Sequence, residues 1–388
     1  MINKIIPYGK QHITSEDVQA VVDALNSDFL TQGPAIAEFE SCFAKYVGAK
    51  YAVAVCNATA GLHIAAMALN VKPGDKVLST PITFVASTNC VLYCGGEIEF
   101  VDIDPNTYLI DLDKLEDKLK TVPKGTYKGI IPVDFAGYPL DMERLHKTAK
   151  EYGLWVIEDA CHAPGAYFTD SNGNKQFSGN ASYSEFGIFS FHPVKHIASG
   201  EGGMVTTNNK ELYEKLCLLR THGITKNADL LIENHGGWYY EMQTLGYNYR
   251  ITDFQAALGN SQLKRADTGL KRRNEIAEKY NKAFQNASIR TPQFPENGYH
   301  AYHLYVIQVE NRKGLYNYLK ENNIYSQILY IPVHTMPYYK KLGFKKGDYP
   351  VAEKYYEHCL ALPMFPTLTK EEQDWVIEKV LCYIQNKK

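Results

Sequence analysis

The sequence of 388 residues has no long apolar run and no excess of charge of one sign. No run reaches roughly 18 apolar residues, the length that would cross a bilayer, and the start, MINKIIPYGKQHITSEDV, has no apolar core of signal-peptide length. With 41 basic and 43 acidic residues, no global field would attract nucleic acid or an anionic membrane. We therefore expect a cytoplasmic protein that binds neither nucleic acid nor membranes.

The eight cysteines show no CxxC spacing. They lie mostly within apolar runs such as VAVCNATA and NCVLYCGG, which predicts buried free thiols in a reducing compartment. Hydrophobic residues make up 45% and charged residues 22%, close to globular averages, and the 29 tyrosines are the only clear excess. The composition indicates a soluble enzyme or binding protein of about two domains.

From about residue 50, short β-type runs alternate with helical stretches, which is typical of crossover units on a mainly parallel sheet. A helical region then extends from Asp253 to about Phe284, and a smaller α+β part ends in a helix, where Thr369 and Glu372 fit a capping box. We predict an α/β protein with a large domain at 1–255 and a small C-terminal domain at 256–388 that includes the bridging helix. The expected strands are YAVAVCN, KVLSTP, EIEFVDID, YKGIIPVDF, LWVIEDA, SEFGIFSF and GGMVTTN.

Ligands of open parallel sheets gather at the carboxyl ends of the strands, so these ends are the places to inspect. In CNATAGLH, a strand ends at Asn57 and a helix is expected to start near Thr59. Exposed amides of Thr59 and Ala60, the Thr59 hydroxyl and the helix dipole would form an anion site. The same residues also fit ordinary helix capping.

In WVIEDACHAPG, an apolar strand runs directly into Glu158 and Asp159. Carboxylates at the end of a buried strand cost several kcal/mol unless they are paired, so a cationic partner is expected. A protonated pyridine nitrogen would serve, and so would an arginine elsewhere in the chain.

In FGIFSFHPVKHIASGEGGMV, a strand brings Ser190 and Lys195 to a segment that ends in GEGG, whose glycines allow close approach of a ligand. Lys195 lies between the apolar Val194 and Ile197, which would partly desolvate the amine, lower its pKa and make it nucleophilic. Taken alone, such a lysine is more often a surface residue.

His192 and His196 lie four residues apart, a spacing that suits a metal when both are on one helix. Pro193 breaks such a helix, and no acidic residue is nearby. We therefore predict no metal site.

Taken together, NATAGLH, EDACH, SFHPVK with GEGG just after it, and GYNYR match in order the landmarks of the DegT/DnrJ/EryC1/StrS family of sugar aminotransferases. The segments SDFLTQGPAIAEFE, PITFVAS, YHLYVI and LPMFPTLTKEEQDWVI extend this resemblance over nearly the whole chain. The resemblance implies the type I fold of pyridoxal-phosphate-dependent transferases, which is aspartate aminotransferase-like, and pyridoxal 5′-phosphate as the cofactor.

The resemblance also implies roles at the cofactor ring. Lys195 would bind the cofactor as a Schiff base, and Asp159 would keep the pyridine nitrogen protonated so that the ring acts as an electron sink. Phe84 in PITFVAS matches the aromatic residue that stacks on the ring, and His162 matches the residue near its phenolic oxygen.

At the phosphate, the resemblance implies a cup formed by Thr59, the Ala60 amide and Ser190. Asn248 matches the residue that reaches the phosphate of the neighbouring subunit's cofactor. A homodimer with shared active sites is implied.

Within the family, this chain resembles most the transaminases of pseudaminic acid biosynthesis, which aminate C4 of a UDP-linked 4-keto-6-deoxy-N-acetyl-hexose with L-glutamate. The resemblance implies UDP-2-acetamido-2,6-dideoxy-β-L-arabino-hexos-4-ulose as the substrate, although enzymes for sugars of the UDP-bacillosamine or GDP-perosamine type share much of it. The residues expected on the sugar and nucleotide side are Tyr8, Asp28, Phe29, Leu30, Thr31, Ala58, Leu329, Tyr330, Ile331, Pro332 and His334.

Three alternatives belong to other classes of protein. Asp102 and Asp104 resemble the metal-binding DxD of glycosyltransferases, although they fit equally a strand end and a turn at Pro105. A sugar dehydratase of the same fold would have histidine in place of Lys195. A non-catalytic sensor would be expected to lose Lys195, Asp159 or the phosphate cup, and all of these are present.

Overall fold

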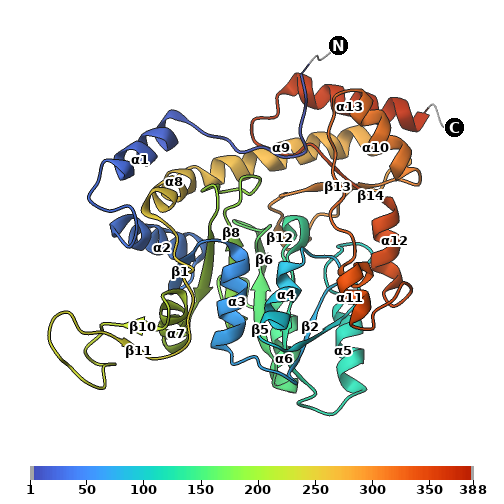
Figure 1. The fold of residues 1–388 in the computed structure, drawn as a ribbon. Helices are drawn as coiled ribbons and strands as arrows, with labels where there is room; N and C mark the ends of the chain where they lie inside the picture. The colour runs from blue at the N-terminus through green and yellow to red at the C-terminus, as the bar shows by residue number, and fades with distance from the viewer. Residues whose placement is uncertain (1–3, 386–388) are drawn as a thin grey trace.

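The computed structural model describes residues 4–385 and is built around a seven-stranded sheet (Figure 1). Five neighbouring strands, β8, β5, β4, β2 and β3, run parallel, and β9 is antiparallel to both of its neighbours. The predicted mainly parallel α/β fold is therefore confirmed. From one edge to the other the strands are β1 (Tyr51–Val55), β9 (Gly203–Thr207), β8 (Phe186–Ser190), β5 (Trp155–Asp159), β4 (Tyr127–Ile131), β2 (Lys76–Ser79) and β3 (Glu97–Phe100).

Helices cover both faces of this sheet, because successive side chains of a strand point to opposite faces. Val53 and Val55 of β1 pack into a core on one face, whereas Ala52 and Ala54 pack into another core on the opposite face. Both faces are buried, so the strands are continuously apolar, as expected for a parallel sheet. The helices of this part are α1 (Ser15–Leu25), α2 (Pro34–Val47), α3 (Ala58–Ala68), α4 (Ala86–Tyr93), α5 (Leu112–Lys120), α6 (Met142–Tyr152) and α7 (Lys210–Arg220).

The expected bridging region is two helices, α8 (Asp253–Leu263) and α9 (Ala266–Phe284). The predicted domain boundary after residue 255 falls inside α8, and the division into two domains stays a prediction. The C-terminal part contains β13 (Tyr305–Gln308), α10 (Arg312–Glu321), α11 (Pro337–Lys341), α12 (Pro350–His358), β14 (Cys359–Leu362) and α13 (Lys370–Gln385).

The capping box expected before the last helix is confirmed. The amide of Thr369 donates to Glu372 Oε2 at 3.0 Å, and the amide of Glu372 donates to Thr369 Oγ1 at 3.1 Å. These reciprocal bonds satisfy two amides that α13 cannot pair internally.

Several short elements were not expected from the sequence. A three-stranded sheet joins β6 (Tyr167–Thr169), β7 (Lys175–Phe177) and β12 (Gly298–Tyr299). An arm carrying β10 (Ile224–Thr225) and β11 (Glu241–Met242) extends from the end of α7, at the lower left of Figure 1. Two 3₁₀ turns lie at Phe135–Gly137 and Val333–Thr335.

All eight cysteines are free thiols, but the expected burial is only partly right. Cys90 and Cys359 are buried, whereas Cys42 is exposed on α2 and the other five are half-buried. In residues 4–385, no helix is both long enough and apolar enough to cross a bilayer.

Candidate active site

Asp159 lies at the carboxyl end of β5 with only 6% of its surface exposed. The Ser87 hydroxyl donates to its Oδ2 at 2.6 Å, and the Cys161 amide donates to its Oδ1 at 3.2 Å. Thr83 Oγ1 is 2.7 Å from Ser87 Oγ and donates to it, since the single Ser87 proton is directed to the carboxylate. The described residues give Asp159 hydroxyl and amide partners but no ion pair.

Lys195 lies in the turn that follows β8, where its amide donates to the carbonyl of His192 at 2.8 Å. Burial lowers the pKa of the Lys195 amine, and the nearby Cys161 and Asp159 partly oppose this shift. This confirms the desolvation expected from its apolar neighbours. An amine with a lowered pKa is unprotonated more often, which makes it a better nucleophile and base.

His162 and Tyr330 meet beside this pair. The Nδ1 of His162 accepts from the Ala136 amide at 3.2 Å, so the neutral ring carries its proton on Nε2, which lies 3.1 Å from the Tyr330 hydroxyl. Burial lowers the pKa of His162 well below its ordinary value, with a further effect from Lys195. Burial also raises the pKa of Tyr330, and Asp159 and Tyr8 add to that shift. His162 is therefore neutral, and Tyr330 keeps its proton and remains a donor.

The start of α3 and the end of β8 come together across Gly203. Gly203 pairs with Ser190 on one side and with Val55 on the other. A Cβ on Gly203 would lie 2.6 Å from the amide nitrogen of Ala58, so only glycine allows this approach. The segments expected to form the phosphate cup therefore lie next to each other. The close approach also explains why the last residue of GEGG is a glycine.

The expectation of a free amide at Ala60 was wrong, and that of a free amide at Thr59 stays a prediction. The helix begins at Ala58, with Asn57 as its N-cap, and the Ala60 amide donates to Asn57 Oδ1 at 2.8 Å. Ala60 is 4% exposed, whereas Thr59 is half-buried. Capping, the alternative explanation, therefore applies to the Ala60 amide.

The residues expected near the sugar fall into three groups. Tyr8, Leu329 and Tyr330 are half-buried and pack against one apolar core cluster, and Phe84 is exposed with its ring centre 6.2 Å from that of Tyr330. Pro332 is buried and Ile331 exposed on the irregular segment that continues from Tyr330.

His334 is different, because its side chain is fully buried and its Nε2 lies 2.9 Å from Glu353 Oε1. It is not free to line a pocket while this pair is intact. A direct contact with a substrate would require the pair to open.

The segment from Asp28 to Thr31 lies on the surface between α1 and α2. Phe29 and Leu30 are each about half exposed, and the Leu30 carbonyl accepts from the amide of Asp253 at the start of α8. Asn248 is also exposed, at the base of the arm, where it forms a bridge with Thr221. Within one chain, these residues stand on the outer surface.

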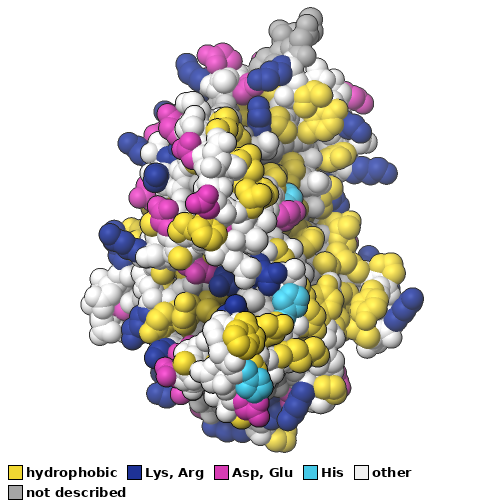
Figure 2. All heavy atoms as spheres, turned by 60° about the vertical axis from the view of Figure 1, so that its left-hand side comes forward, with side chains coloured by type: hydrophobic (Ala, Val, Ile, Leu, Met, Phe, Trp, Pro, Cys, Tyr) yellow, Lys and Arg dark blue, Asp and Glu magenta, His cyan; other side chains and the backbone are white. Residues whose placement is uncertain are grey.

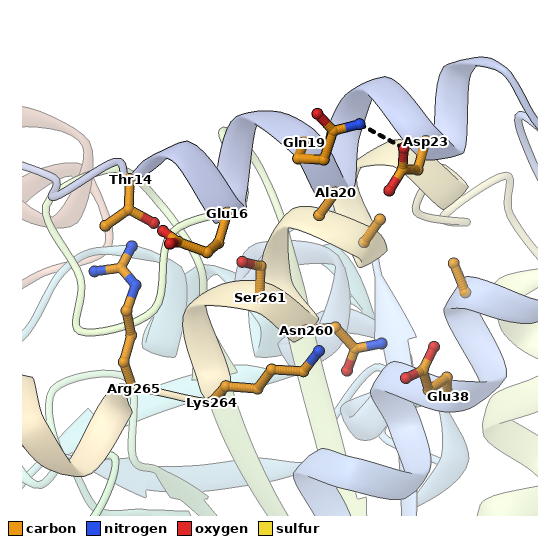
Figure 3. Close-up of a pocket in the computed structure, with 12 residues that line it drawn as sticks. Thr14, Glu16, Gln19, Ala20, Asp23, Glu38, Asn260, Ser261, Lys264 and Arg265 are labelled. Atoms are coloured by element: carbon orange, nitrogen blue, oxygen red, sulfur yellow. Dashed lines mark hydrogen bonds between the residues drawn. The ribbon is translucent and has the colours of Figure 1, made fainter.

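A pocket of about 550 Å³ lies between α1, α2 and α8 (Figure 3). Gln19 and Asp23 form one of its walls, linked by a 2.7 Å hydrogen bond, and Arg265 closes one end. None of the expected site residues lines it. A smaller pocket of about 240 Å³ is the one that Lys195 lines, and it shares Arg265 with the first.

Sequence reasoning missed several polar residues of this region. Ser87 and Thr83 belong to the PITFVAS segment, which was noted only for Phe84. His303 belongs to YHLYVI, which was noted for the family resemblance, and its ring centre is 4.3 Å from that of His162. Nothing in the local pattern marks Arg273, which is 1% exposed in α9.

Asp102 and Asp104, the DxD pair, have separate structural roles. Asp102 accepts from the amides of Val351 and Ala352 at the start of α12, at 2.9 and 3.0 Å. Asp104 Oδ1 accepts from the amide of Asn106 at 2.8 Å and so has the turn role that the sequence allowed as its alternative.

The fold is that of an aminotransferase. The putative sugar aminotransferase Spr1654 from Streptococcus pneumoniae, solved in PLP and PMP forms, superposes with TM-scores of 0.89 and 0.90 at 30% identity, with 98% of this chain and 99% of that chain covered. Pyridoxal phosphate is the cofactor of this class of enzyme.

The chain belongs to the DegT/DnrJ/EryC1/StrS aminotransferase family, whose model matches residues 11–381. It is 41% identical over 387 residues to the spore coat polysaccharide biosynthesis protein SpsC of Bacillus subtilis (97% of both chains). It is 35% identical over 393 residues to the UDP-4-amino-4,6-dideoxy-N-acetyl-beta-L-altrosamine transaminase of Campylobacter jejuni serotype O:23/36 (99% of both chains). The family membership contradicts the glycosyltransferase alternative.

Proposed function

We propose that this chain transfers the amino group of L-glutamate to C4 of a nucleotide-linked 4-keto-6-deoxy sugar, with pyridoxal phosphate bound to Lys195. The observation that carries the proposal is that the buried Asp159 has no cationic partner among the described residues, while desolvation lowers the pKa of the half-buried Lys195. These residues fit a cofactor that has a pyridinium nitrogen and an aldehyde. When bound, pyridoxal phosphate supplies an electron sink for the pair of electrons released at the donor's α-carbon.

The side chains divide the work of proton transfer and positioning. Asp159, fixed by Ser87, would stabilise the positive ring nitrogen, and Ser190 with the start of α3 would hold the phosphate. The Lys195 amine takes the proton from the α-carbon of the donor and returns it during the reverse reaction on the sugar. Phe84 would cover the ring, and His162, which lies in hydrogen-bond contact with the Tyr330 hydroxyl, would keep that hydroxyl available as a donor to the cofactor.

For the substrate, we propose UDP-2-acetamido-2,6-dideoxy-β-L-arabino-hexos-4-ulose, the substrate implied by the sequence resemblance and supported by the Campylobacter relative. Tyr8 and Leu329–Pro332 would face the sugar, together with Ala58 and the segment from Asp28 to Thr31. The higher identity to SpsC, a protein of spore coat polysaccharide biosynthesis, favours testing other 4-keto sugars as well, including those of the UDP-bacillosamine and GDP-perosamine type.

We further propose a cytoplasmic homodimer in which Asn248 of one subunit completes the site of the other. Large apolar side chains on the arm and on the α1–α2 face support an interface there, since a monomer rarely exposes so many together. That face is turned toward the viewer in Figure 2, and apolar side chains lie in groups along it. The most exposed are Val18, Leu25, Phe29 and Leu30 on this face and Ile232, Trp238, Met242 and Leu245 on the arm.

The test is an absorbance spectrum of the purified protein with pyridoxal phosphate. We expect the cofactor band to change to that of the amino form on addition of glutamate and to return on addition of the UDP-linked keto-sugar. Lys195→Arg should keep the fold and lose both changes. A protein that shows no cofactor band, or whose band does not respond to any amino donor, would refute the proposed function.

Return of the band with one keto-sugar and not with others identifies the substrate. Return only with a sugar of the bacillosamine or perosamine type would replace the proposed substrate and leave the aminotransferase activity intact.

A further inference from the structure

The pocket of about 240 Å³ beside Lys195 is strongly cationic. Five of the side chains that line it are basic, and no aspartate or glutamate lines it. They come from the N-terminal segment, the Lys195 turn and α8–α9, and they are Lys10, Lys195, Arg265, Arg272 and Arg273. Basic groups collected around one cavity predict an anionic ligand.

Arg273 makes this pocket more than a surface patch. Its side chain is 1% exposed, and its Nη1 donates to the backbone carbonyls of Tyr302, His303 and Met364 at 3.1, 3.3 and 2.9 Å. Its Nε is buried without a partner among the described residues. Burial lowers the pKa of Arg273 to about 10, so the guanidinium is still charged at neutral pH.

The neighbouring arginines are neutralised. Arg265 forms an ion pair with the buried Asp17, and Arg272 forms one with Glu275 at 3.1 Å. Arg273 has only neutral carbonyl oxygens as partners. A buried charge without a counter-charge is costly, and an anion in the pocket would remove that cost.

Size and position select the anion. Pockets for drug-sized ligands enclose ~300–1,000 Å³, so about 240 Å³ suits a small acid better than a nucleoside diphosphate. Lys195 lines the same pocket, and so do residues of α9. A ligand that fills the pocket would therefore lie between Lys195 and the arginines.

We propose that this pocket binds the distal carboxylate of the amino donor, a five-carbon amino dicarboxylate, and that Arg273 is the residue that selects it. The assignment rests on the proposed function, because it places the donor of that reaction. A guanidinium matches a carboxylate in shape and charge, and such charge-assisted bonds are stronger than neutral ones. Donors without a distal carboxylate would leave Arg273 unpaired, which gives selectivity.

The experiment measures donor binding apart from turnover. Binding of glutarate, a five-carbon dicarboxylate without an amino group, is measured by titration calorimetry on the cofactor-loaded protein, for the unchanged chain and for Arg273→Met. We expect Arg273→Met to weaken glutarate binding roughly 10- to 100-fold, because the variant loses hydrogen bonds between charged groups. Arg273→Lys should recover part of the loss, and Lys271→Met, an exposed neighbour in the same helix, should change nothing.

The second measurement is the rate of the cofactor's spectral change with glutamate and with alanine. Arg273→Met should reduce the preference for glutamate over alanine and leave the sugar half of the reaction unchanged. Equal loss with both donors, or unchanged glutarate binding, would overturn the assignment. So would displacement of glutarate by UDP in the absence of sugar, because the pocket would then hold phosphates.

Arg273 is buried, so Arg273→Met is checked for folding by circular dichroism. If it does not fold, the double variant Lys10→Met, Arg272→Gln replaces it, since both residues line the pocket nearer to solvent. Loss of two partly screened charges should weaken glutarate binding roughly two- to fivefold. Unchanged glutarate binding would overturn the assignment. Failure of the proposed function is recognised separately, because then the unchanged chain does not respond to glutamate at all.

Discussion

The hydroxyl of Ser87 donates to Oδ2 of Asp159 at 2.6 Å across 72 positions of the sequence. It joins the start of α4 to the end of β5, and Thr83 supports it from the segment before α4. The bond fixes one oxygen of Asp159, while the amide of Cys161 binds the other. The carboxylate is therefore held in a single orientation before any ligand arrives.

Asp159→Asn should slow the first half of the reaction by roughly two to three orders of magnitude, since it removes preorganised charge where the reaction needs it. Ser87→Ala keeps the charge and loses one bond to it, so we expect a loss of about tenfold. Both rates are read from the spectral change with glutamate. Asp159→Asn with an unchanged rate would exclude its assigned role.

Gly203→Ala should disturb the phosphate side of the site. The new Cβ would lie 2.6 Å from the amide nitrogen of Ala58, so strand and helix must separate. We expect a loss of about 1–3 kcal/mol in the free energy of unfolding and weaker binding of pyridoxal phosphate. Gly237→Ala is the matched control, because nothing lies within 4 Å of the added carbon there. Equal effects in both variants would contradict the close contact.

Stability should fall in acid because of buried histidines. Burial lowers the pKa of His162, His196 and His303 well below the ordinary 6.5, and the positive Lys195 and Arg273 add to the shift of His303. The histidines of the unfolded chain therefore bind protons as the pH falls below about 6.5, whereas those of the folded chain do not. The free energy of unfolding therefore decreases as the pH falls below that value. Each histidine contributes about 1.4 kcal/mol per pH unit.

The measurement is the urea midpoint between pH 7.5 and 5. His303→Gln removes one such group and should give a shallower decline, whereas replacing the exposed His235 by Gln should not. Parallel declines in all three proteins would show that carboxylates, not these histidines, cause the loss.

Mixing two inactive variants tests the shared site. If Asn248 serves the other subunit, a hybrid of Lys195→Ala with Asn248→Ala has one complete site and one site with both defects. Random re-association should then restore about a quarter of the native activity at limiting pyridoxal phosphate. Activity no higher than that of the separate parents would place Asn248 outside the partner's site.

The sequence predicted the sheet correctly, because strands buried on both faces are continuous apolar runs that are easily recognised. It also predicted the segments that meet at the strand ends, since parallel strands deliver their carboxyl ends to one edge. It did not predict the Asn57 cap on the Ala60 amide, because an N-cap and an anion site use the same residue types. Ser87, His303 and Arg273 were missed for another reason. Their partners are distant in sequence, and only the packing of α4, β13 and α9 places these residues at the candidate site.

Asp102, which follows β3, binds the amides at the start of α12. The hydroxyl of Tyr339 in α11 forms hydrogen bonds with Thr88 and Asn89 of α4 at 2.5 and 2.7 Å. The C-terminal part is therefore fastened to the sheet-centred part through two of its helices. A hinge rotation that swings α11 and α12 away from the sheet would break all of these bonds at once. Opening and closing of the site around a substrate is thus a task for shorter segments, and this enzyme should work with a nearly rigid frame.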